Sequence, residues 1–417
     1  MKFNSTRDKS LAYSLDEALI LGLAPDGGLF MPQAFPRYDL NSLDVSDYAA
    51  FAVAVLEPFF NESSLKSHLK NICGEAFNFK VPLQPLNNNT QMLELFHGPT
   101  LSFKDFGARF LASSLSYLSK DKKRTIMVAT SGDTGSAVAS AFYEMDHIDV
   151  IILFPQHKIS KRQQQQISCW GKNISCYAVK GRFDDCQRMV KAAFSDERFN
   201  ELNLTTANSI NIGRLLPQMV YYAYSSLKHF KKTNEKINFI IPSGNFGNVT
   251  AAFLAKACGF PINHLHIACN ANHVLMDYLA SGIFTPHESI NTLANAMDVG
   301  NPSNFERLQY LFPQFEDFKH HIHGQSVSDE EIKQAISDAY NNDHVIICPH
   351  TATAYFYRQQ LAGDHTIVAT AHPCKFETII EPLIQEKIDI APQLAWMLEQ
   401  EEKYKVIDAD LEQLEIS

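Results

Sequence analysis

Lys104 lies between two phenylalanines in the stretch HGPTLSFKDFGARF, residues 97–110, at what reads as the first turn of a helix. Ser102 is followed three residues later by Asp105, which predicts a reciprocal capping box and a helix that starts at Phe103. Steps of three and four residues from the lysine reach only small and apolar side chains. The lysine is therefore expected on the apolar face of that helix.

An ammonium group in this position is disfavoured twice, because burial removes its water and the positive end of the helix dipole repels its charge. The free amine is the form that condenses with a carbonyl cofactor. The alternative is a lysine that reaches solvent along its own aliphatic stem, which is the common arrangement near apolar surfaces. Taken alone, the stretch leaves both interpretations open.

Two other stretches lead from an apolar strand through a loop of glycine and polar residues into a helix. They are VATSGDTGSAVAS, residues 128–140, and IPSGNFGNVTAAF, residues 241–253. Backbone N–H groups at a helix N-terminus have no partner within the helix, so each loop could bind an anion such as phosphate. An ordinary capped turn is the alternative for each. The second loop matches neither GxGxxG nor GxxxxGK[ST], which removes the main support for a dinucleotide or a nucleoside triphosphate.

Two further polar positions stand where a ligand could reach them. Arg214 ends the polar stretch ANSINIGR, residues 207–214, and its guanidinium could bind a second phosphate or a carboxylate through two hydrogen bonds. An exposed arginine beside a helix start is the alternative. Thr370 stands near the carboxyl end of the predicted strand HTIVATA, residues 365–371, where its hydroxyl could hydrogen-bond a neutral ring nitrogen.

The composition is that of a globular chain with room for two or three domains. Of its 417 residues, 45% are hydrophobic and 20% are charged. The formal net charge is -10 and no long run of lysine or arginine occurs, so no nucleic-acid partner is expected. No apolar segment reaches the roughly 18 to 20 residues of a membrane span. We therefore expect a soluble protein without a membrane partner.

The cysteines give no sign of a metal or disulfide framework. All eight lack a CxxC partner and are interpreted as small buried apolar residues. The mirrored segments CPH, residues 348–350, and HPC, residues 372–374, lack the spacing of known zinc sites, so no metal is expected. The N-terminus has no signal-peptide apolar region. These features favour a cytoplasmic protein.

Short apolar runs alternate with helical stretches along most of the chain, which predicts an α/β fold with parallel sheets covered on both faces. The first series of predicted strands is 125–130, 149–155 and 174–181, and the second is 237–242, 264–270, 344–349 and 365–371. In such sheets ligands bind beyond the carboxyl ends of the strands.

Three regions follow from this pattern. Residues 1–95 form a mixed N-terminal subdomain that ends after the proline and asparagine cluster at 81–89. Residues 96–200 form a smaller α/β domain with the SGDTG loop. Residues 201–417 form a larger α/β domain with the PSGNFGN loop.

In their order along the chain, these stretches resemble the threonine synthase family, which are pyridoxal-phosphate enzymes of fold type II, the tryptophan-synthase-β-like group. The matching motifs are YSLDEALILGLAPDGGLFMP, HGPTLSFKDFGARF, TSGDTG, NSINIGRLLPQ, PSGNFGN, MDVGNPSNFER and HPCKF. The resemblance implies two open parallel-sheet α/β domains with pyridoxal 5'-phosphate between them.

The resemblance also implies the site residues. Lys104 would be catalytic and would form the internal aldimine with the cofactor. The cofactor-binding residues would be Lys104, Gly244, Asn245, Phe246, Gly247, Asn248 and Thr370. The substrate's phosphate and carboxylate would bind to Ser131, Asp133, Thr134, Asn208, Ser209 and Arg214. The sequence departs from the family's pattern at the Ile-Gly pair of NSINIGR and at Cys374, where a small alanine is usual.

The implied activity is conversion of O-phospho-L-homoserine and water to L-threonine and phosphate, a carbon–oxygen lyase reaction at the end of threonine biosynthesis. Rival interpretations are a serine/threonine dehydratase, a β-replacement synthase of the same fold type, and a family-like protein without catalysis. The dehydratase and the synthase have no use for a second anion site, and the intact Lys104 argues against a non-catalytic protein. The sequence leaves the oligomeric state open, with a monomer slightly favoured.

Overall fold

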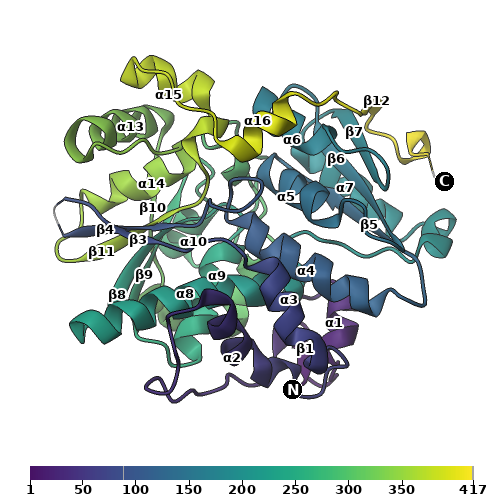
Figure 1. Cartoon of the computed structure of the whole chain (residues 1–417), viewed down its shortest axis with the longest axis horizontal. Helices are drawn as coiled ribbons and strands as arrows, with labels where there is room; N and C mark the ends of the chain where they lie inside the picture. The colour runs from purple at the N-terminus through teal and green to yellow at the C-terminus, as the bar shows by residue number, and fades with distance from the viewer. Residues whose placement is uncertain (88, 416–417) are drawn as a thin grey trace.

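The strands form three sheets in the computed structural model, which describes residues 1–87 and 89–415 (Figure 1). Position 88, within the predicted break at 81–89, and positions 416–417, at the end of the predicted larger domain, lie outside the described residues. A two-stranded antiparallel sheet near the N-terminus joins β1 (Phe3–Ser5) to β2 (Phe30–Pro32). The other two sheets carry the α/β architecture.

The smaller α/β sheet has the order β12-β7-β6-β5 and is parallel throughout. Its strands are β5 (Arg124–Ala129), β6 (Ile148–Pro155), β7 (Ile174–Lys180) and β12 (Lys405–Asp408). The helices that alternate with them are α5 (Asp133–Phe142), α6 (Lys161–Ser168) and α7 (Phe183–Ala193). The first three strands were predicted from their apolar runs, and the alternation with helices is confirmed.

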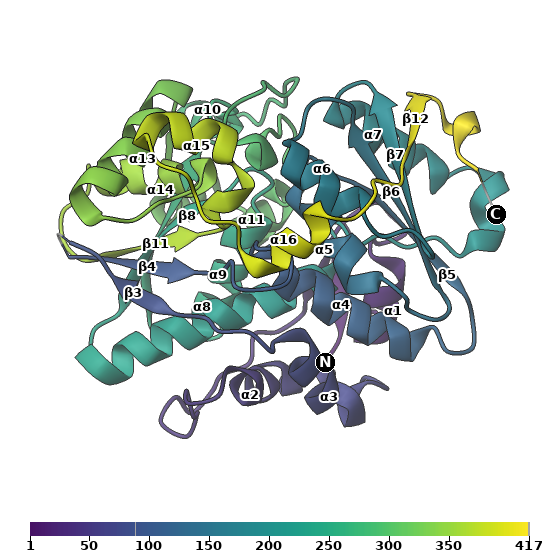
Figure 2. The same cartoon turned by 45° about the horizontal axis from the view of Figure 1, so that its top comes forward.

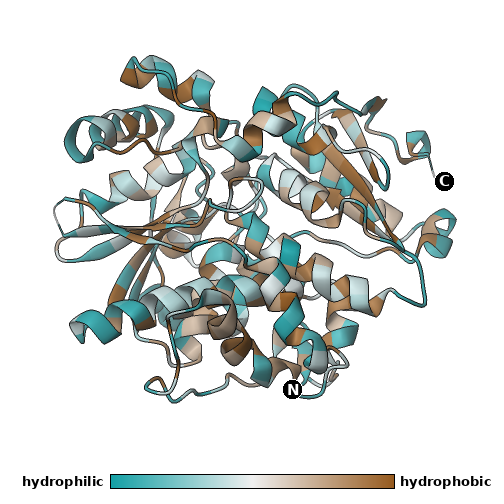
Figure 3. Cartoon of the chain, viewed as in Figure 1, coloured by the Kyte–Doolittle hydropathy of each residue, from teal (hydrophilic) through white to brown (hydrophobic). Residues whose placement is uncertain are grey.

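The larger sheet has the order β10-β9-β8-β11-β4-β3 and is parallel except for β3, which runs antiparallel to β4. Its strands are β3 (Leu83–Pro85), β4 (Thr90–Glu94), β8 (Ile237–Pro242), β9 (Ile262–Cys269), β10 (His323–Ser326) and β11 (His365–Ala369). Figure 3 shows the hydrophobic strands of both sheets in the interior.

The strand predicted at 344–349 is wrong. Residues 344–348 form no strand, and helix α14 (Pro349–Arg358) begins directly after them. Ile347 and Cys348 are nevertheless buried in a hydrophobic cluster with residues of β11. The apolar run therefore reflects burial of side chains rather than pairing of the backbone.

The remaining helices cover the larger sheet and build the N-terminal region. The N-terminal helices are α1 (Leu15–Leu21), α2 (Tyr48–Phe60), α3 (Leu69–Ala76) and α4 (Lys104–Leu118). Those that follow α7 along the chain are α8 (Ile212–Thr233), α9 (Gly247–Ala257), α10 (Val274–Ser281), α11 (Phe305–Leu311), α12 (Phe315–His321), α13 (Asp329–Asp343), α14, α15 (Glu377–Ile384) and α16 (Pro392–Leu398). No helix among residues 1–87 and 89–415 is long and apolar enough to cross a bilayer.

Three strands pair in a sheet outside the region that was predicted for them. Strands β3 and β4, from the N-terminal segment, belong to the larger sheet, where β4 lies beside β11. Strand β12, near the C-terminus, pairs with β7 in the smaller sheet, and Figure 2 shows the chain passing from the larger sheet through α16 to reach it. The division at 95 and 200 stays a prediction.

Candidate active site

Lys104 is the first residue of α4, but the predicted capping box is wrong. Phe103 occupies the cap position and its side chain makes no capping hydrogen bond. The Asp105 carboxylate instead accepts hydrogen bonds from the backbone N–H of Thr100 at 2.9 Å and from its hydroxyl at 2.6 Å. The helix start is therefore held by the turn before it, and Ser102 is left with a buried, unpartnered hydroxyl among the described residues.

The amine of Lys104 is easier to deprotonate than an ordinary lysine. Burial lowers the pKa of Lys104 from 10.5 to about 8. The nearby cations Arg214 and Lys375 act in the same direction, while the carboxylate of Asp133 opposes them. A pKa near 8 leaves about a tenth of Lys104 as free amine at pH 7, the form that attacks a carbonyl carbon.

The loop after β8 is shaped for close approach to a ligand. Phe246 precedes α9 in the left-handed conformation, with φ of 57°, and the N–H groups of the first turn of α9 have no acceptor within the helix. A Cβ on Gly244 would lie 2.5 Å from Cα of Met297, so only glycine fits against that backbone. These features suit a phosphate bound at a helix N-terminus.

Side chains beside this loop are held by mutual hydrogen bonds. Asn245 donates to the Ser209 hydroxyl at 2.6 Å, and its side-chain oxygen accepts from the backbone N–H of Ser303 at 2.6 Å. Asn248 accepts hydrogen bonds from two tyrosine hydroxyls, those of Tyr221 at 2.6 Å and Tyr222 at 2.8 Å. The amide nitrogen of Asn248 remains a free donor at the cavity among the described residues.

The loop after β5 forms a second helix N-terminus. The Thr130 hydroxyl accepts the backbone N–H groups of Gly132 at 3.0 Å and Gly135 at 2.8 Å. The N–H groups of Asp133 and Thr134 lie between them, in the first turn of α5, where the helix itself supplies no acceptor. Gly132 has φ of 138°, a conformation that favours glycine.

Arg214 is buried where α8 passes α4. A Cβ on Gly107 of α4 would lie 2.6 Å from Nε of Arg214, so the two helices meet in close contact there. Its Nη1 donates to the carbonyl of Ala207, while Nε has no partner among the described residues. Burial lowers the pKa of Arg214 to about 10, which still leaves a cation at neutral pH, and Asp105 opposes that effect.

The residues present fit pyridoxal phosphate. Two hydroxyls of the cavity, Thr370 Oγ1 and Ser243 Oγ, are buried without a partner in the part of the chain that the structure describes. Orphaned groups of this kind are costly unless a ligand satisfies them. Together with the amine of Lys104 and the helix start at Gly247, they offer partners for a ring nitrogen, an aldehyde carbon and a phosphate.

Most of the predicted site residues line this one cavity. Those that do are Lys104, Asp133, Thr134, Ser209, Arg214, Gly244, Asn245, Phe246, Gly247, Asn248 and Thr370. Two predicted substrate-binding residues do not: Asn208 lines a larger neighbouring cavity, and Ser131 lines neither of the two. Three of the segments that line this cavity directly follow the carboxyl ends of strands β5, β8 and β11, as expected for parallel sheets.

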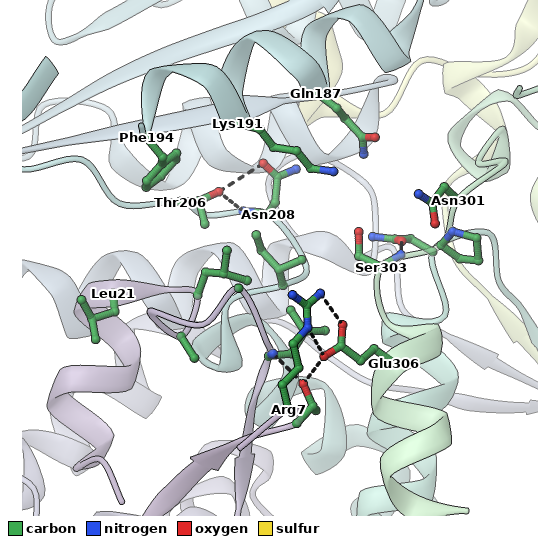
Figure 4. A pocket seen from close by; sticks show the side chains of 18 of the residues that line it. Arg7, Leu21, Gln187, Lys191, Phe194, Thr206, Asn208, Asn301, Ser303 and Glu306 are labelled. Atoms are coloured by element: carbon green, nitrogen blue, oxygen red, sulfur yellow. Dashed lines mark hydrogen bonds and ion pairs between the residues drawn. The ribbon is translucent and has the colours of Figure 1, made fainter. Parts of the chain in front are cut away.

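The larger cavity, of about 1200 Å³, opens beside the site and shares Asn245 with it (Figure 4). Lys191 and Gln187 project from α7 on one wall. On another wall Arg7 pairs with Glu306 at 3.1 Å. Its volume exceeds that of a small amino acid, and it adjoins the site at Asn245.

Three side chains near the site were missed by the reasoning from sequence. Lys375, within the motif HPCKF, is fully buried and pairs with Asp133 at 2.7 Å. His350 lines the cavity, accepts the backbone N–H of Ala296 at 3.0 Å, and is neutral because burial lowers its pKa to about 4. Ser243 is the third. The signal that could have identified Lys375 is a single lysine shortly after the apolar strand predicted at 365–371.

No metal site is evident in the described part of the chain. No group of three or more His, Cys, Asp or Glu residues there could hold an ion. His350 and Cys348 face one another at 3.8 Å, and no third ligand accompanies them.

Comparison with known families covers the chain almost end to end. Residues 80–371 match the family described as pyridoxal-phosphate dependent enzyme. Residues 2–77 match the threonine synthase N terminus, and residues 349–416 match the threonine synthase C-terminal region.

Individual relatives and solved structures agree with these matches. Threonine synthase of Serratia marcescens is 38% identical over 406 residues, which cover 95% of this chain and 94% of that protein. The crystal structure of threonine synthase from Escherichia coli superimposes with a TM-score of 0.92 at 36% identity, covering 99% of this chain and 98% of that one. Threonine synthase from Brucella melitensis with bound pyridoxal phosphate gives 0.91 at 31% identity, covering 99% and 97%.

Proposed function

The chain belongs to the threonine synthase family of pyridoxal-phosphate-dependent enzymes, and from that premise we propose that it converts O-phospho-L-homoserine and water to L-threonine and phosphate. One observation supports this substrate most directly. Two helix N-termini, those of α5 and α9, and the buried cation Arg214 line the same cavity as the amine of Lys104. A substrate with both a carboxylate and a phosphate, bound beside a phosphorylated cofactor, needs that many sites for anions.

For the cofactor, Lys104 would supply the amine that binds the aldehyde carbon. The backbone N–H groups at the start of α9, within residues 244–248, would bind the cofactor phosphate. The free hydroxyl of Thr370 would hydrogen-bond the ring nitrogen. When bound, pyridoxal phosphate withdraws electrons from the carbons next to the substrate's amino nitrogen, which makes their protons removable.

For the substrate, the N–H groups of Asp133 and Thr134 and the guanidinium of Arg214 would bind its carboxylate and phosphate. Ser209 lies between the loops, where its hydroxyl accepts hydrogen bonds from Asn245 and Asn304. Its own proton is then available to a substrate oxygen. Asn208 and Ser131 stay predictions for the same role, although they stand outside the inner cavity.

Lys104 would carry the protons of the reaction. Its Nζ would take the proton from the α carbon of the substrate and would then move protons at the β and γ carbons. Phosphate leaves the γ carbon, which ends as a methyl group. Water would add its oxygen at the β carbon. A pKa near 8 suits both acceptance and release of protons near neutral pH.

The direct test compares substrates on the purified, cofactor-loaded protein. We expect release of phosphate from O-phospho-L-homoserine with formation of an equal amount of L-threonine. O-acetylserine and L-threonine serve as substrates of the rival β-replacement and dehydratase reactions. Phosphate release no faster than without protein, or faster turnover of either rival substrate, would show that the proposed reaction is wrong.

The protein is proposed to act in the cytoplasm, with a monomer slightly favoured over an oligomer. All eight cysteines are free and buried, as in proteins of a reducing compartment. Gel filtration of the loaded protein at assay concentration would test the oligomeric state.

A further inference from the structure

We propose that Lys375 is a positioning residue: it neutralises and holds the carboxylate of Asp133, so that the loop at 131–135 offers backbone N–H groups rather than a negative charge to an anionic group of the substrate. This inference rests on the proposed function, because the substrate's carboxylate or phosphate is the anion that the loop would bind.

The pair is fully enclosed. Nζ of Lys375 lies 2.7 Å from Oδ1 of Asp133, and the two side chains are 0% and 3% exposed. Gln163 of α6 donates to the same oxygen at 3.0 Å. Asp133 is also the first residue of α5, so its carboxylate lies beside the N–H groups that an anion would use. An unpaired negative charge in that place would repel the ligand directly.

The same ammonium group reaches the turn that carries the reactive lysine. Nζ of Lys375 donates to the carbonyl of Thr100 at 2.9 Å. Thr100 in turn donates twice to Asp105, the neighbour of Lys104 in the first turn of α4. Lys375 thereby connects the anion loop of the smaller sheet to the start of α4 through one cation.

Lys375 itself is fixed from the smaller domain as well. It belongs to the short helix Pro373–Lys375 that follows β11, and its backbone carbonyl accepts the Ser160 hydroxyl at 3.2 Å. Gln163 accepts a hydrogen bond from Asn295 at 3.0 Å, in the segment that closes over Gly244. The position of the Asp133 carboxylate is thus determined by residues from both sheets.

The charged and titratable groups that act on Asp133 come from three directions. Lys375 lies after β11, His350 on α14 and Lys104 on α4. Burial alone would raise the pKa of Asp133, but Lys375 and, to a smaller extent, His350 lower it to about 2. Because His350 is neutral near pH 7, Lys375 supplies most of this effect. Without Lys375, the pKa of Asp133 rises and its charge becomes dependent on pH.

This difference gives a test that a purely structural role does not predict. Pyridoxal-phosphate-loaded wild-type protein, Lys375→Met and the double variant Asp133→Asn/Lys375→Met are titrated with inorganic phosphate and, separately, with L-threonine by calorimetry from pH 6 to 9. The two probes distinguish a loop that binds phosphate from one that binds carboxylate. Lys180→Met, which breaks an exposed pair with Asp408 in the smaller sheet, is the matched control.

For at least one probe, we expect Lys375→Met to bind as well as wild type near pH 6 and about tenfold more weakly at pH 9, because Asp133 ionises without its partner. The double variant keeps the backbone N–H of residue 133 and removes only its carboxylate, so it should lose this extra pH dependence and bind more tightly than Lys375→Met at pH 9. Lys180→Met should bind within about threefold of wild type at every pH. Equal affinities of Lys375→Met and wild type at all pH values for both probes would overturn the proposal. So would a double variant no better than Lys375→Met, or a wild type that binds neither probe.

The role of Lys375 can be separated from misfolding of a variant and from failure of the proposed reaction. If Lys375→Met fails to fold, the double variant, which has no unpaired buried charge, carries the comparison with wild type at pH 9. Its failure to fold or to bind would then overturn the positioning role. Since both probes are measured by binding, absence of threonine formation in the wild type would refute the proposed reaction without deciding the role of Lys375.

Discussion

The carboxylate of Asp105 accepts both the backbone N–H of Thr100, at 2.9 Å, and its hydroxyl, at 2.6 Å. Both residues are buried, and the carboxylate replaces the helix-capping serine that the local sequence predicts. A Cβ on Gly98 would lie 2.4 Å from Oδ2 of Asp105, so the turn from Gly98 to Asp105 closes tightly on itself. The first turn of α4, and with it the backbone of Lys104, is thereby held in place.

Replacement of Asp105 by alanine should destabilise the protein by about 1–3 kcal/mol, because it leaves buried donors of Thr100 without an acceptor. Urea unfolding followed by circular dichroism measures this free energy. Asp44→Ala, whose carboxylate caps an exposed turn at Ser46, is a control that should cost much less. Equal losses for the two variants would contradict the structural role of Asp105.

Replacement of Lys104 by alanine should abolish the visible absorption band of the protein-bound cofactor. The purified variant should then absorb no more than the free pyridoxal phosphate that it contains. It should also lower turnover of O-phospho-L-homoserine by about three orders of magnitude or more, since the proton carrier is lost. Spectra and phosphate release measure the two effects. A variant that keeps the visible band would show that another amine holds the cofactor.

The rate of cofactor uptake should depend on pH in a way set by Lys104. Only the free amine attacks the aldehyde, and burial lowers the pKa of Lys104 from 10.5 to about 8. Uptake of pyridoxal phosphate by the apoprotein should therefore rise with pH and level off above about pH 8. Stopped-flow absorbance from pH 6 to 10.5 measures it. A rate that still climbs steeply at pH 10 would mean that the amine is not perturbed.

Gly244→Ala should weaken cofactor binding by at least about tenfold, because the added Cβ would lie 2.5 Å from Cα and 2.6 Å from the carbonyl oxygen of Met297. The control is Gly74→Ala in α3, where a Cβ meets nothing within 4 Å and should add up to about 1 kcal/mol of helix stability. Equilibrium dialysis of pyridoxal phosphate and thermal unfolding separate the two effects. Unchanged binding in Gly244→Ala would exclude close contact of this loop with the phosphate.

Thr370→Val should leave the apoprotein's unfolding temperature within about 2 °C, because Oγ1 has no partner to lose among the described residues. The backbone of Thr370 keeps its hydrogen bonds with Phe103 and Thr351. The dissociation constant of pyridoxal phosphate should nevertheless rise about tenfold, as expected for one lost hydrogen bond. Identical cofactor affinity in the two proteins would remove Thr370 from the site.

Elements with strong periodic patterns could be predicted from sequence. The runs at 149–155 and 237–242 are continuous and apolar because both faces of their strands are covered, and both strands form as expected. The run at 344–349 has the same composition but forms no strand, since burial alone does not select a backbone partner. Strand β4 was missed because its mixed sequence becomes a strand only when β11 lies beside it.

The sequence by itself determined the family and predicted the reactive lysine and the two anion-binding loops, because these depend on short motifs whose local geometry the chain can adopt on its own. Only the tertiary structure decided what surrounds them. Lys375 reaches Asp133 across 242 positions of the chain, and no local pattern predicts an ion pair between residues so far apart. Burial then sets their charges, because the cost of removing a group from water depends on everything packed around it.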